Sequence, residues 1–218
     1  MTSSERSAAA AADGCRQGSP AGGSGAFKPQ LHMIRRTLDN LPALVLPTGC
    51  SIRCFRDGWE KKWERIITES FEAQPGTYDF EKVMRADPSF RPERILFACF
   101  GEEPAAVAAA YSWPHKLPGG MLHYVGALKS HRGMGLGRAV SLAALYRMKE
   151  DGFTTAWLST DDFRLPAIKT YLDLGFVPLL VHENQRARWA AVFEKLGRPG
   201  LIRDFSDIMS GAVLNLGT

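Results

Sequence analysis

The sequence contains no apolar run of the about 20 residues that a membrane-spanning helix needs. Its N-terminus also lacks the apolar core of a secretory signal, so we expect neither a membrane anchor nor a signal peptide. Charge of one sign is in small excess, because 27 Lys and Arg stand against 23 Asp and Glu, a formal net charge of +4. That surplus fits an anionic small ligand and is far from the strongly basic composition of nucleic-acid-binding proteins, so we expect no nucleic-acid partner.

Cysteine is scarce, and its spacing argues against the usual metal sites. The four cysteines, Cys15, Cys50, Cys54 and Cys99, form no C-x-x-C pair and have no companion pair of histidines. The sequence therefore predicts no zinc or other metal site. A reduced, cytoplasmic setting is the simplest account of four cysteines without a disulfide pattern.

Length and composition predict one globular domain with an extension at each end. Hydrophobic residues make up 45% of the 218 residues and charged residues 23%, the mixture of an ordinary folded domain. Residues 1–26 are rich in Ala, Ser and Gly and predict a disordered tail. We expect a short lead-in over 27–47, the folded domain over 48–196 and a loose extension over 197–218.

Hydrophobic periodicity predicts strands that alternate with helices. Pro42 and Pro47 interrupt the lead-in, so any helix there is short. Short apolar or alternating runs predict strands at 51–55, 94–100, 105–113, 121–128, 154–160 and 176–181. Helical spacing predicts helices at 59–71, 80–85, 141–149, 167–174 and 182–196. This order predicts a central mixed α/β sheet with flanking helices.

The most informative stretch is a glycine-rich turn at residues 131–140, HRGMGLGRAV. It follows a predicted strand and opens a predicted helix, so free backbone N–H groups and the helix dipole would face one point, which suits a phosphate or pyrophosphate. A dinucleotide fingerprint would need a third glycine where Arg138 stands, and the chain contains no P-loop string. What remains is R-x-x-G-x-G, formed by Arg132, Gly135 and Gly137.

With its flanks, this motif resembles the Gcn5-related N-acetyltransferase (GNAT) family, in which R/Q-x-x-G-x-G/A binds the pyrophosphate of acetyl-coenzyme A. The predicted strand at 154–160 and the string AIKTYLDLGF at 167–176 follow in that family's order, and the string TDDFRLPAI resembles a bacterial subgroup of it. The resemblance covers residues 122–180 and implies the GNAT fold, with a mostly antiparallel twisted sheet. It also implies acetyl-coenzyme A as co-substrate and N-acetyl transfer to a primary amine by direct attack in a ternary complex.

The resemblance also assigns the residues that would bind the coenzyme. Backbone groups at the end of strand 121–128 would pair with the pantetheine arm and stabilise the oxyanion; these belong to Gly126, Ala127, Leu128 and Lys129. The pyrophosphate would lie on the turn, formed by Arg132, Gly133, Met134, Gly135, Leu136, Gly137 and Arg138. Many relatives carry Asn near the next helix start, where this chain has Asp161 and Asp162. Asp162 is assigned to coenzyme binding, and capping of that helix by one of the two is the alternative.

Tyr171 aligns with the tyrosine that many family members use to protonate the coenzyme A thiolate, so it is the candidate general acid. The alternative is a core aromatic, because Ile168, Tyr171 and Leu172 form an ordinary helical stripe. Arg164 could reach the coenzyme or the acceptor, and an ordinary surface arginine is equally consistent with the sequence.

The general base is the least determined residue. His123 is the candidate chosen, because a histidine titrates near neutrality; Glu69, Tyr124, Glu102 and water are the alternatives. Strand alternation predicts that only one of His123 and Tyr124 faces the cleft. The four cysteines give no reason to expect an acyl-enzyme.

The sequence leaves the acceptor open among a small metabolite amine, an antibiotic and a peptide amine, and the acyl chain could be longer than acetyl. We expect Trp113 and the segment 72–92 to shape the acceptor pocket. A non-catalytic acyl-coenzyme A-binding module is the alternative function, which Tyr171 would distinguish. Trp189 and Phe193 on the helix at 186–196 could form a homodimer contact.

Overall fold

A computed structural model describes residues 28–112, Leu117 and 119–215, which form one seven-stranded sheet with helices on both faces. The strands are β1 (Leu31–Arg35), β2 (Cys50–Cys54), β3 (Ile95–Phe100), β4 (Glu103–Ser112), β5 (Gly120–Ala127), β6 (Ala156–Thr160) and β7 (Val177–Leu179). Their order in the sheet is β2-β3-β4-β5-β6-β1-β7. Every neighbouring pair is antiparallel except β5 and β6, which are parallel. The expected mixed, mostly antiparallel sheet is therefore confirmed.

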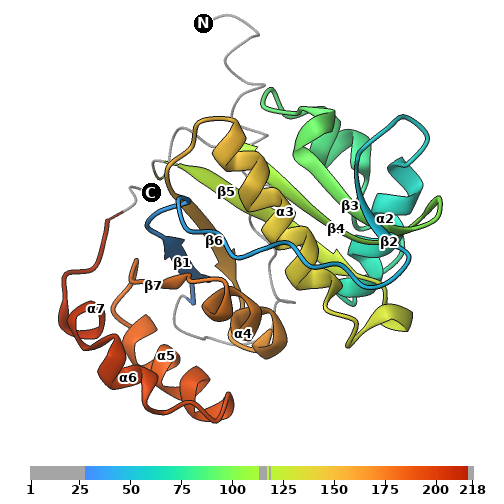
Figure 1. Ribbon diagram of the computed structural model, residues 1–218. Helices are drawn as coiled ribbons and strands as arrows, with labels where there is room; N and C mark the ends of the chain where they lie inside the picture. Colours follow the sequence, from blue (N-terminus) through green and yellow to red (C-terminus); the bar gives the residue numbers. More distant parts are fainter. Residues whose placement is uncertain (1–27, 113–116, 118, 216–218) are drawn as a thin grey trace, which may run out of the picture.

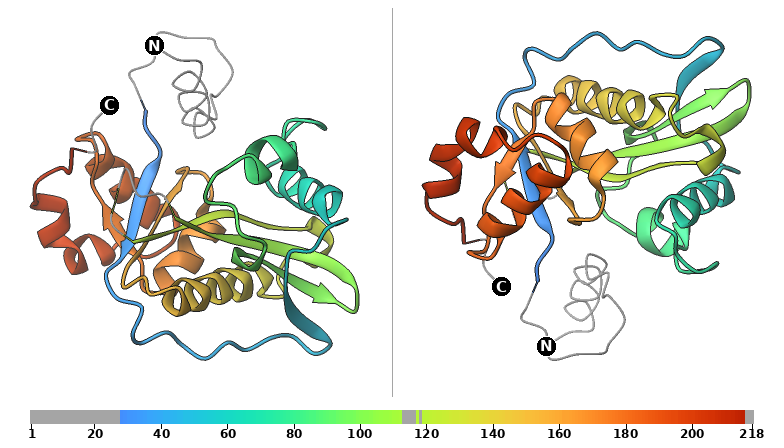
Figure 2. Two further views of the ribbon diagram at one scale, coloured as in Figure 1. Left: turned by 90° about the horizontal axis from the view of Figure 1, so that it is seen from above. Right: turned by 90° about the horizontal axis from the view of Figure 1, so that it is seen from below.

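Different helices cover the two faces of the sheet. Helix α2 (Glu60–Ser70) and the π-helical turn η2 (Glu81–Arg85) cover one face, and α3 (Leu136–Glu150) covers the other (Figures 1 and 2). The remaining helices are α4 (Leu165–Asp173), α5 (Gln185–Lys195), α6 (Leu201–Asp204) and α7 (Ser206–Ser210), with short 3₁₀ turns η3 (Pro92–Arg94) and η4 (Lys129–His131). Among the described residues, no helix is both long and apolar enough to cross a membrane.

An aromatic core lies between α2 and the sheet. Trp59, Trp63 and the isoleucines that follow form the apolar stripe of α2, which explains why this amphipathic segment folds as predicted. The ring of Trp63 lies edge-on to those of Phe80 and Tyr124, with centroids 5.3 and 5.1 Å apart. This contact holds the ring of Tyr124, on β5, against α2.

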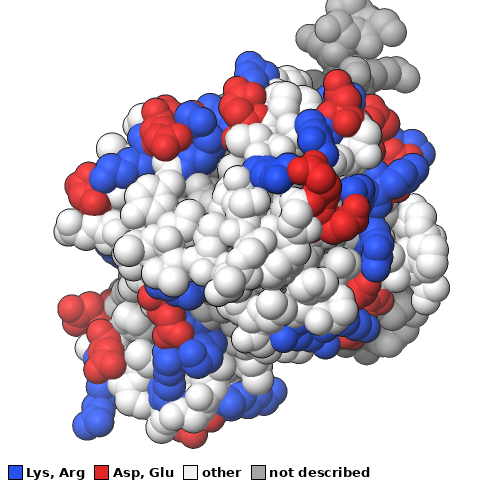
Figure 3. Space-filling model, turned by 45° about the vertical axis from the view of Figure 1, so that its right-hand side comes forward, with Lys and Arg blue, Asp and Glu red and all other residues white. Residues whose placement is uncertain are grey.

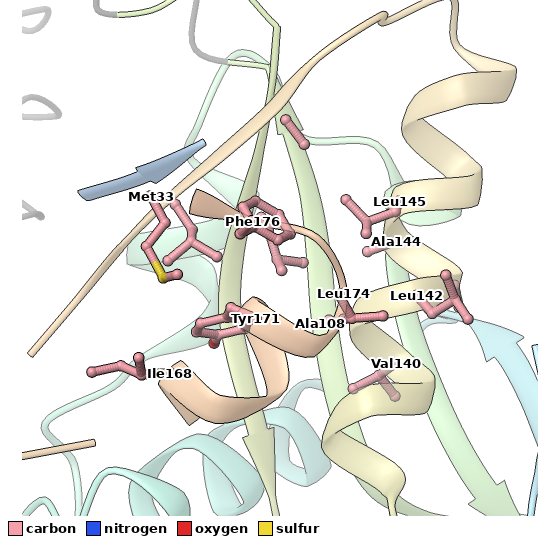
Figure 4. Close-up of a cluster of buried hydrophobic side chains, with 14 of the residues drawn as sticks. Met33, Ala108, Val140, Leu142, Ala144, Leu145, Ile168, Tyr171, Leu174 and Phe176 are labelled. Atoms are coloured by element: carbon pink, nitrogen blue, oxygen red, sulfur yellow. The ribbon is translucent and has the colours of Figure 1, made fainter. Parts of the chain in front are cut away.

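The second core lies between the sheet and α3, and small side chains make it thin. Ala106, Ala108 and Ala110 of β4 are buried here against Val140 and Ala144 of α3, so the helix can approach the sheet closely. Met33 of β1, Tyr171 of α4 and Phe176 gather in the same core (Figure 4).

The N-terminal segment contains a strand where we expected at most a short helix. Strand β1 lies between β6 and β7 and is antiparallel to both, with Met33 opposite Leu158 and Pro178. Leu31 and Met33 are fully buried, and His32 and Ile34, which alternate with them, are partly exposed. The five-residue alternation was too short to recognise without its partners, which lie more than 120 residues further along the chain.

The C-terminal segment is also more ordered than expected. We predicted a loose extension from residue 197, but α6 and α7 pack on α5, and the rings of Phe193 and Phe205 lie 5.9 Å apart. The guanidinium of Arg186 donates to the carbonyls of Met209 and Gly211. Trp189 and Phe193 are fully buried within the chain, so the expectation that they form a homodimer contact was wrong.

Candidate functional site

The sheet opens between β5 and β6. These parallel strands pair only where they begin, with Gly120 opposite Ala156 and Met121 opposite Trp157. Beyond those two pairs β5 runs on to Ala127 and β6 to Thr160 without a shared register. The separation that the family resemblance implied is therefore present, and it exposes backbone groups of β5 along one side of a cleft.

A cavity of about 80 Å³ occupies the cleft. Strands β5 and β6 form its two sides, α4 closes one end, and single residues reach in from α2 and from the segment before β1. The lining residues are Gln30, Phe71, Met121, Leu122, His123, Tyr124, Val125, Ser159, Thr160, Asp161, Arg164, Ala167 and Tyr171.

A β-bulge interrupts β5 inside the cleft. Ala109 of β4 faces His123 and Val107 faces Gly126, so Tyr124 and Val125 share the single partner Ala108. Tyr124 adopts a φ of 45°, which is uncommon for a residue other than glycine. The bulge breaks the alternation of the strand, and the rings of His123 and Tyr124 lie 3.9 Å apart on the same face. The prediction that only one of them faces the cleft was wrong.

The glycine-rich turn leaves β5 and leads into α3. Gly133 and Gly135 have φ values of 81° and 75°, which side chains other than glycine rarely allow, and Gly135 precedes the first residue of α3. A Cβ atom added at Gly133, Gly135 or Gly137 would meet no atom of the described residues within 4 Å. The turn is thus open on the side that a ligand would approach, and within the described part of the chain no side chain caps α3.

Basic and acidic side chains meet at this turn. The ammonium of Lys129 and the guanidinium of Arg132 lie 3.5 and 3.6 Å from the carboxylate of Glu72. The backbone N–H of Lys129 donates to the carboxylate of Glu69. Arg138, at the start of α3, has no hydrogen bond or ion pair with the described residues. An anion at the turn would therefore meet one free cation and two that are shared with Glu72.

A larger open hollow of about 580 Å³ lies on the outer side of α2. It is lined by Glu64, Glu69, Glu72 and Lys129 among others, so it borders the turn but not the cleft. Because it is wide and holds neither Tyr171 nor His123, the smaller cleft is the better candidate for chemistry.

The geometry of the cleft and turn agrees with the comparison to known proteins. Residues 56–176 match the acetyltransferase (GNAT) family. The chain belongs to this family. Its fold also resembles that of a GCN5-related N-acetyltransferase from Sphaerobacter thermophilus, with a TM-score of 0.56 at 23% identity over 69% of this chain and 49% of that one. A second such protein, from Kribbella flavida, gives a TM-score of 0.50 at 20% identity over 69% and 55%.

Curated relatives of this GNAT chain carry the name mycothiol acetyltransferase. The one from Thermomonospora curvata is 31% identical over 155 residues, which are 67% of this chain and 51% of the relative. The one from Thermobispora bispora is 31% identical over 160 residues, which are 67% and 53%. The chain therefore spans about half the length of the curated relatives it matches.

Tyr171 lies on α4 with its ring in the core and lines the cleft. Burial raises the pKa of the Tyr171 hydroxyl to about 12, against a weaker opposing effect of the nearby Arg164 charge. The hydroxyl has no hydrogen-bond partner among the described residues. The hydroxyl therefore stays protonated at neutral pH, and the ring belongs to the core while the residue lines the cleft. The role of Tyr171 as proton donor stays a prediction.

His123 also lines the cleft, but it does not titrate near neutrality as expected. Burial lowers the pKa of His123 to about 4, and the more distant Asp87 carboxylate offsets only part of this effect. The ring of Tyr111 packs edge-on against it, with centroids 5.4 Å apart. At neutral pH His123 is therefore an uncharged, weak base.

Of the other candidate bases, Glu69 and Glu102 lie outside the cleft, whereas Tyr124 lines it. Glu69 accepts the N–H of Lys129, as described above. Glu102 lies at the turn between β3 and β4, where it pairs with Arg53 and Arg56. Tyr124 remains in the cleft beside His123, where its position beside the bulge is set by α2.

Asp162 is engaged with charged side chains instead of facing the cleft. Its carboxylate lies 2.6 Å from the guanidinium of Arg188 on α5 and 3.1 Å from the ammonium of Lys28. The residue before α4 is Arg164, and within the described chain no side chain caps this helix. The expectation that Asp161 or Asp162 caps it was therefore wrong. Asp161 instead lines the cleft and pairs with Arg164.

Sequence reasoning did not single out most of the lining residues, and two of them, Gln30 and Phe71, come from outside the strands and the helix that frame the cleft. Gln30 reaches the cleft because β1 lies in the sheet, and no local signal marks it. Phe71 ends the α2 stripe that the periodicity did identify. No described residue of the segment 72–92, which we expected to shape the acceptor pocket, is in the cleft lining; Tyr78 of this segment packs on Tyr124, with ring centroids 6.2 Å apart. The other expected pocket residue, Trp113, lies outside the described residues.

Charge and metal-ligand chemistry add little to the site. In the described part of the chain, no group of three or more His, Cys, Asp or Glu side chains is placed to hold a metal ion. Basic and acidic side chains alternate around a broad uncharged area on the face drawn in Figure 3, so the small basic surplus is not gathered into one patch there.

Proposed function

We propose that this chain is an N-acetyltransferase that transfers the acetyl group of acetyl-coenzyme A to a primary amine by direct attack in a ternary complex. The observation that carries the proposal is the opening between β5 and β6, whose cleft is lined by Tyr171 and whose strand β5 continues into the glycine-rich turn. Family membership supports the same reaction. The names of the curated relatives, which are acetyltransferases, agree with it.

The turn fits a pyrophosphate. The open space above Gly133, Gly135 and Gly137 lets phosphate oxygens approach the backbone, and the N-terminus of α3 adds partial positive charge. Arg132, Arg138 and Lys129 would supply charge-assisted bonds once a phosphate displaces Glu72. Leu136 is buried and would contribute only its backbone, and Met134 is exposed beside it.

The exposed edge of β5 would hold the pantetheine arm. Gly126, Ala127 and Leu128 follow the bulge, and Lys129 begins the turn, so their backbone groups extend from the cleft to the phosphate site. In a bulge one residue lacks a ladder partner, which leaves a backbone N–H free to stabilise the oxyanion of the reacting thioester. Asp162 is left out of this proposal because Arg188 and Lys28 occupy its carboxylate.

In the reaction, the amine nitrogen bonds to the acetyl carbon while the carbon–sulfur bond breaks. Tyr171 would give its proton to the leaving thiolate, since it is protonated and faces the cleft. His123, uncharged but weakly basic, would accept the amine proton directly or through water.

The described cysteines support direct transfer without an acyl-enzyme. Cys50, Cys54 and Cys99 are free thiols, and the cleft lining contains none of these three. Burial raises the pKa of Cys99 to about 11, so its thiol is a poor nucleophile at neutral pH.

The small cleft favours a small-molecule amine as acceptor. The test is release of free thiol from acetyl-coenzyme A in the presence of a panel of amines, with the acetylated product identified by mass. We expect thiol release that depends on both the protein and an amine. Tight coenzyme binding without release, for every amine of the panel, would instead indicate a non-catalytic coenzyme-binding module.

A further inference from the structure

Arg164 spans the mouth of the cleft. It precedes the first residue of α4, and its guanidinium carbon lies 4.1 Å from the centroid of the Phe71 ring on the opposite side. Its Nε donates to Asp161, 3.2 Å away. The side chain is 22% exposed and lines the cleft, so it is held in a defined place at the boundary between cavity and solvent.

The outer edge of this guanidinium is free. A guanidinium has five N–H donors, of which Asp161 takes the one on Nε. Neither terminal nitrogen of Arg164 has a hydrogen-bond partner among the described residues. These two nitrogens form the edge that binds a carboxylate through two parallel bonds. A partly buried fork with both terminal nitrogens unpaired is the arrangement expected of a residue that awaits an anion.

The surroundings leave that edge available to a ligand. Asp161 is the acidic residue in the lining, and both of its carboxylate oxygens are engaged, one by Arg164 and the other by the amide of Gln30, 3.2 Å away. Ser159 and Thr160 add neutral hydroxyl-bearing residues. The phosphate site of the coenzyme lies elsewhere, at the N-terminus of α3 with its own cations.

We propose that Arg164 binds a carboxylate of the acceptor, so that the preferred substrates are amines that carry a carboxylate close to the amino group. The inference rests on the proposed function and names the acceptor class of that site. Arg164 directly precedes α4, Tyr171 lies on α4 seven residues further on, and both line the cleft. A carboxylate on Arg164 would therefore place an α- or β-amino group near the thioester.

The test compares acceptors that carry or lack the carboxylate, in the natural chain and in a variant, so that differences in amine reactivity cancel between the two proteins. An α-amino acid, its amide and its decarboxylated amine are each assayed by thiol release. For the natural chain we expect kcat/KM to favour the acid about 10- to 100-fold, mainly through KM, which is the size of a charged hydrogen-bonded pair. In Arg164→Met the ratio of acid to amide should fall toward 1.

Arg94→Met is the matched control. Arg94 has the same 22% side-chain exposure, its Nε lies 2.6 Å from Asp151, and its guanidinium lies 5.8 Å from the ring centroid of Phe153. It lies outside the cleft, so this variant should keep the acid-to-amide ratio. If both variants alter the ratio equally, the effect is structural and the proposal is overturned.

A binding measurement separates this inference from the proposed reaction. Calorimetric titration of the same acid and amide, with coenzyme A present, measures the affinity for the acceptor without turnover. Acid binding that is stronger than amide binding and is lost in Arg164→Met supports the inference even if no amine is acetylated. Equal binding of acid and amide to the natural chain contradicts it even if amines are acetylated.

Discussion

At the scale of single residues, burial favours the uncharged forms of Tyr171 and His123, which both line the cleft. The same desolvation raises the pKa of Tyr171 to about 12 and lowers that of His123 to about 4. A phenol that stays protonated holds a proton for the leaving thiolate, and its raised pKa makes it a weaker acid than an exposed tyrosine. An imidazole that stays neutral can accept a proton but cannot hold it strongly, so His123 is the weaker of the two assignments.

Replacing Tyr171 by Phe tests the donor role. We expect kcat to fall by about 100-fold or more, the usual contribution of a general acid. Coenzyme affinity and stability should change little, because the hydroxyl has no partner among the described residues. Thiol release measures kcat, calorimetry measures coenzyme affinity, and thermal unfolding measures stability. A folded variant with natural kcat would contradict the assignment.

The depressed pKa of His123 predicts how stability depends on pH. The unfolded chain binds this proton below about 6.5, whereas the folded chain binds it only below about 4. Stability from this residue is therefore complete above pH 6.5 and falls between 6.5 and 4, by up to about 3 kcal/mol. Urea unfolding across this range should show the fall, and His123→Gln should flatten it.

The control is His131→Gln, which removes a histidine from the surface of the turn and leaves the buried one. This variant should keep the pH dependence of the natural chain. An unchanged slope in His123→Gln would show that other groups cause the fall.

Residues of the site were predictable where a motif carries them. The glycine-rich turn was identified from its own residues, and Gly133 and Gly135 adopt the positive φ values that such a turn needs. Its assignment to the coenzyme came from the family resemblance. Tyr171 followed from the family resemblance. Gln30 and the partner of Asp162 could not be predicted, since both depend on segments more than 20 residues away that meet only in the folded chain.

At the scale of elements, the glycines of the turn have opposite effects on stability and on ligand access. Its glycines cost stability, yet their missing side chains leave the turn open to a ligand. Gly137, the second residue of α3, does not need the positive φ that Gly133 and Gly135 adopt. Its absence of a side chain therefore has no conformational reason, which makes it a direct probe of ligand approach.

Gly137→Ala should change stability and coenzyme affinity in opposite directions. Alanine is a better helix former than glycine by up to about 1 kcal/mol, and its Cβ would meet no described atom within 4 Å. We expect thermal unfolding at a higher temperature together with several-fold weaker binding of acetyl-coenzyme A. Gly200→Ala, an equally open position just before α6, should leave binding unchanged. Natural affinity in Gly137→Ala would show that the coenzyme does not approach there.

Strand β1 has a weak sequence pattern but a central place in the sheet. It has five residues but bonds to two strands, and Met33 is fully buried in the core. Met33→Ala should lower the free energy of unfolding by about 2–5 kcal/mol, as for other buried methionines. Ile34→Ala, at the partly exposed neighbouring position, should cost less. Equal losses in urea unfolding would contradict the burial pattern.

Element prediction succeeded where helices and strands have a strong local pattern. The α2 stripe and the strands β3 to β6 appear as expected. The bulge in β5 gave no signal, because Tyr124 takes a positive φ that favours glycine. The helices α6 and α7 have four and five residues, too few to show a helical period.

At the scale of the whole molecule, the two ends of the described chain stabilise the same side of the sheet. Strand β1 lies between β6 and β7, and the backbone N–H of Leu214 donates to the carbonyl of Leu180 just after β7. The side chain of Gln185 on α5 donates to the carbonyl of Gln30, 2.7 Å away. The wall of the cleft formed by Gln30 therefore depends on contacts outside the matched family region.

The central claim is that the turn and the opening between β5 and β6 together bind acetyl-coenzyme A. Calorimetric titration of the full chain with acetyl-coenzyme A, beside NAD and ATP, tests it most directly. We predict saturable binding of acetyl-coenzyme A and much weaker binding of the two nucleotides, which have phosphates for the turn but no pantetheine arm for β5. No binding to the folded chain, or equal binding of all three, would contradict the account.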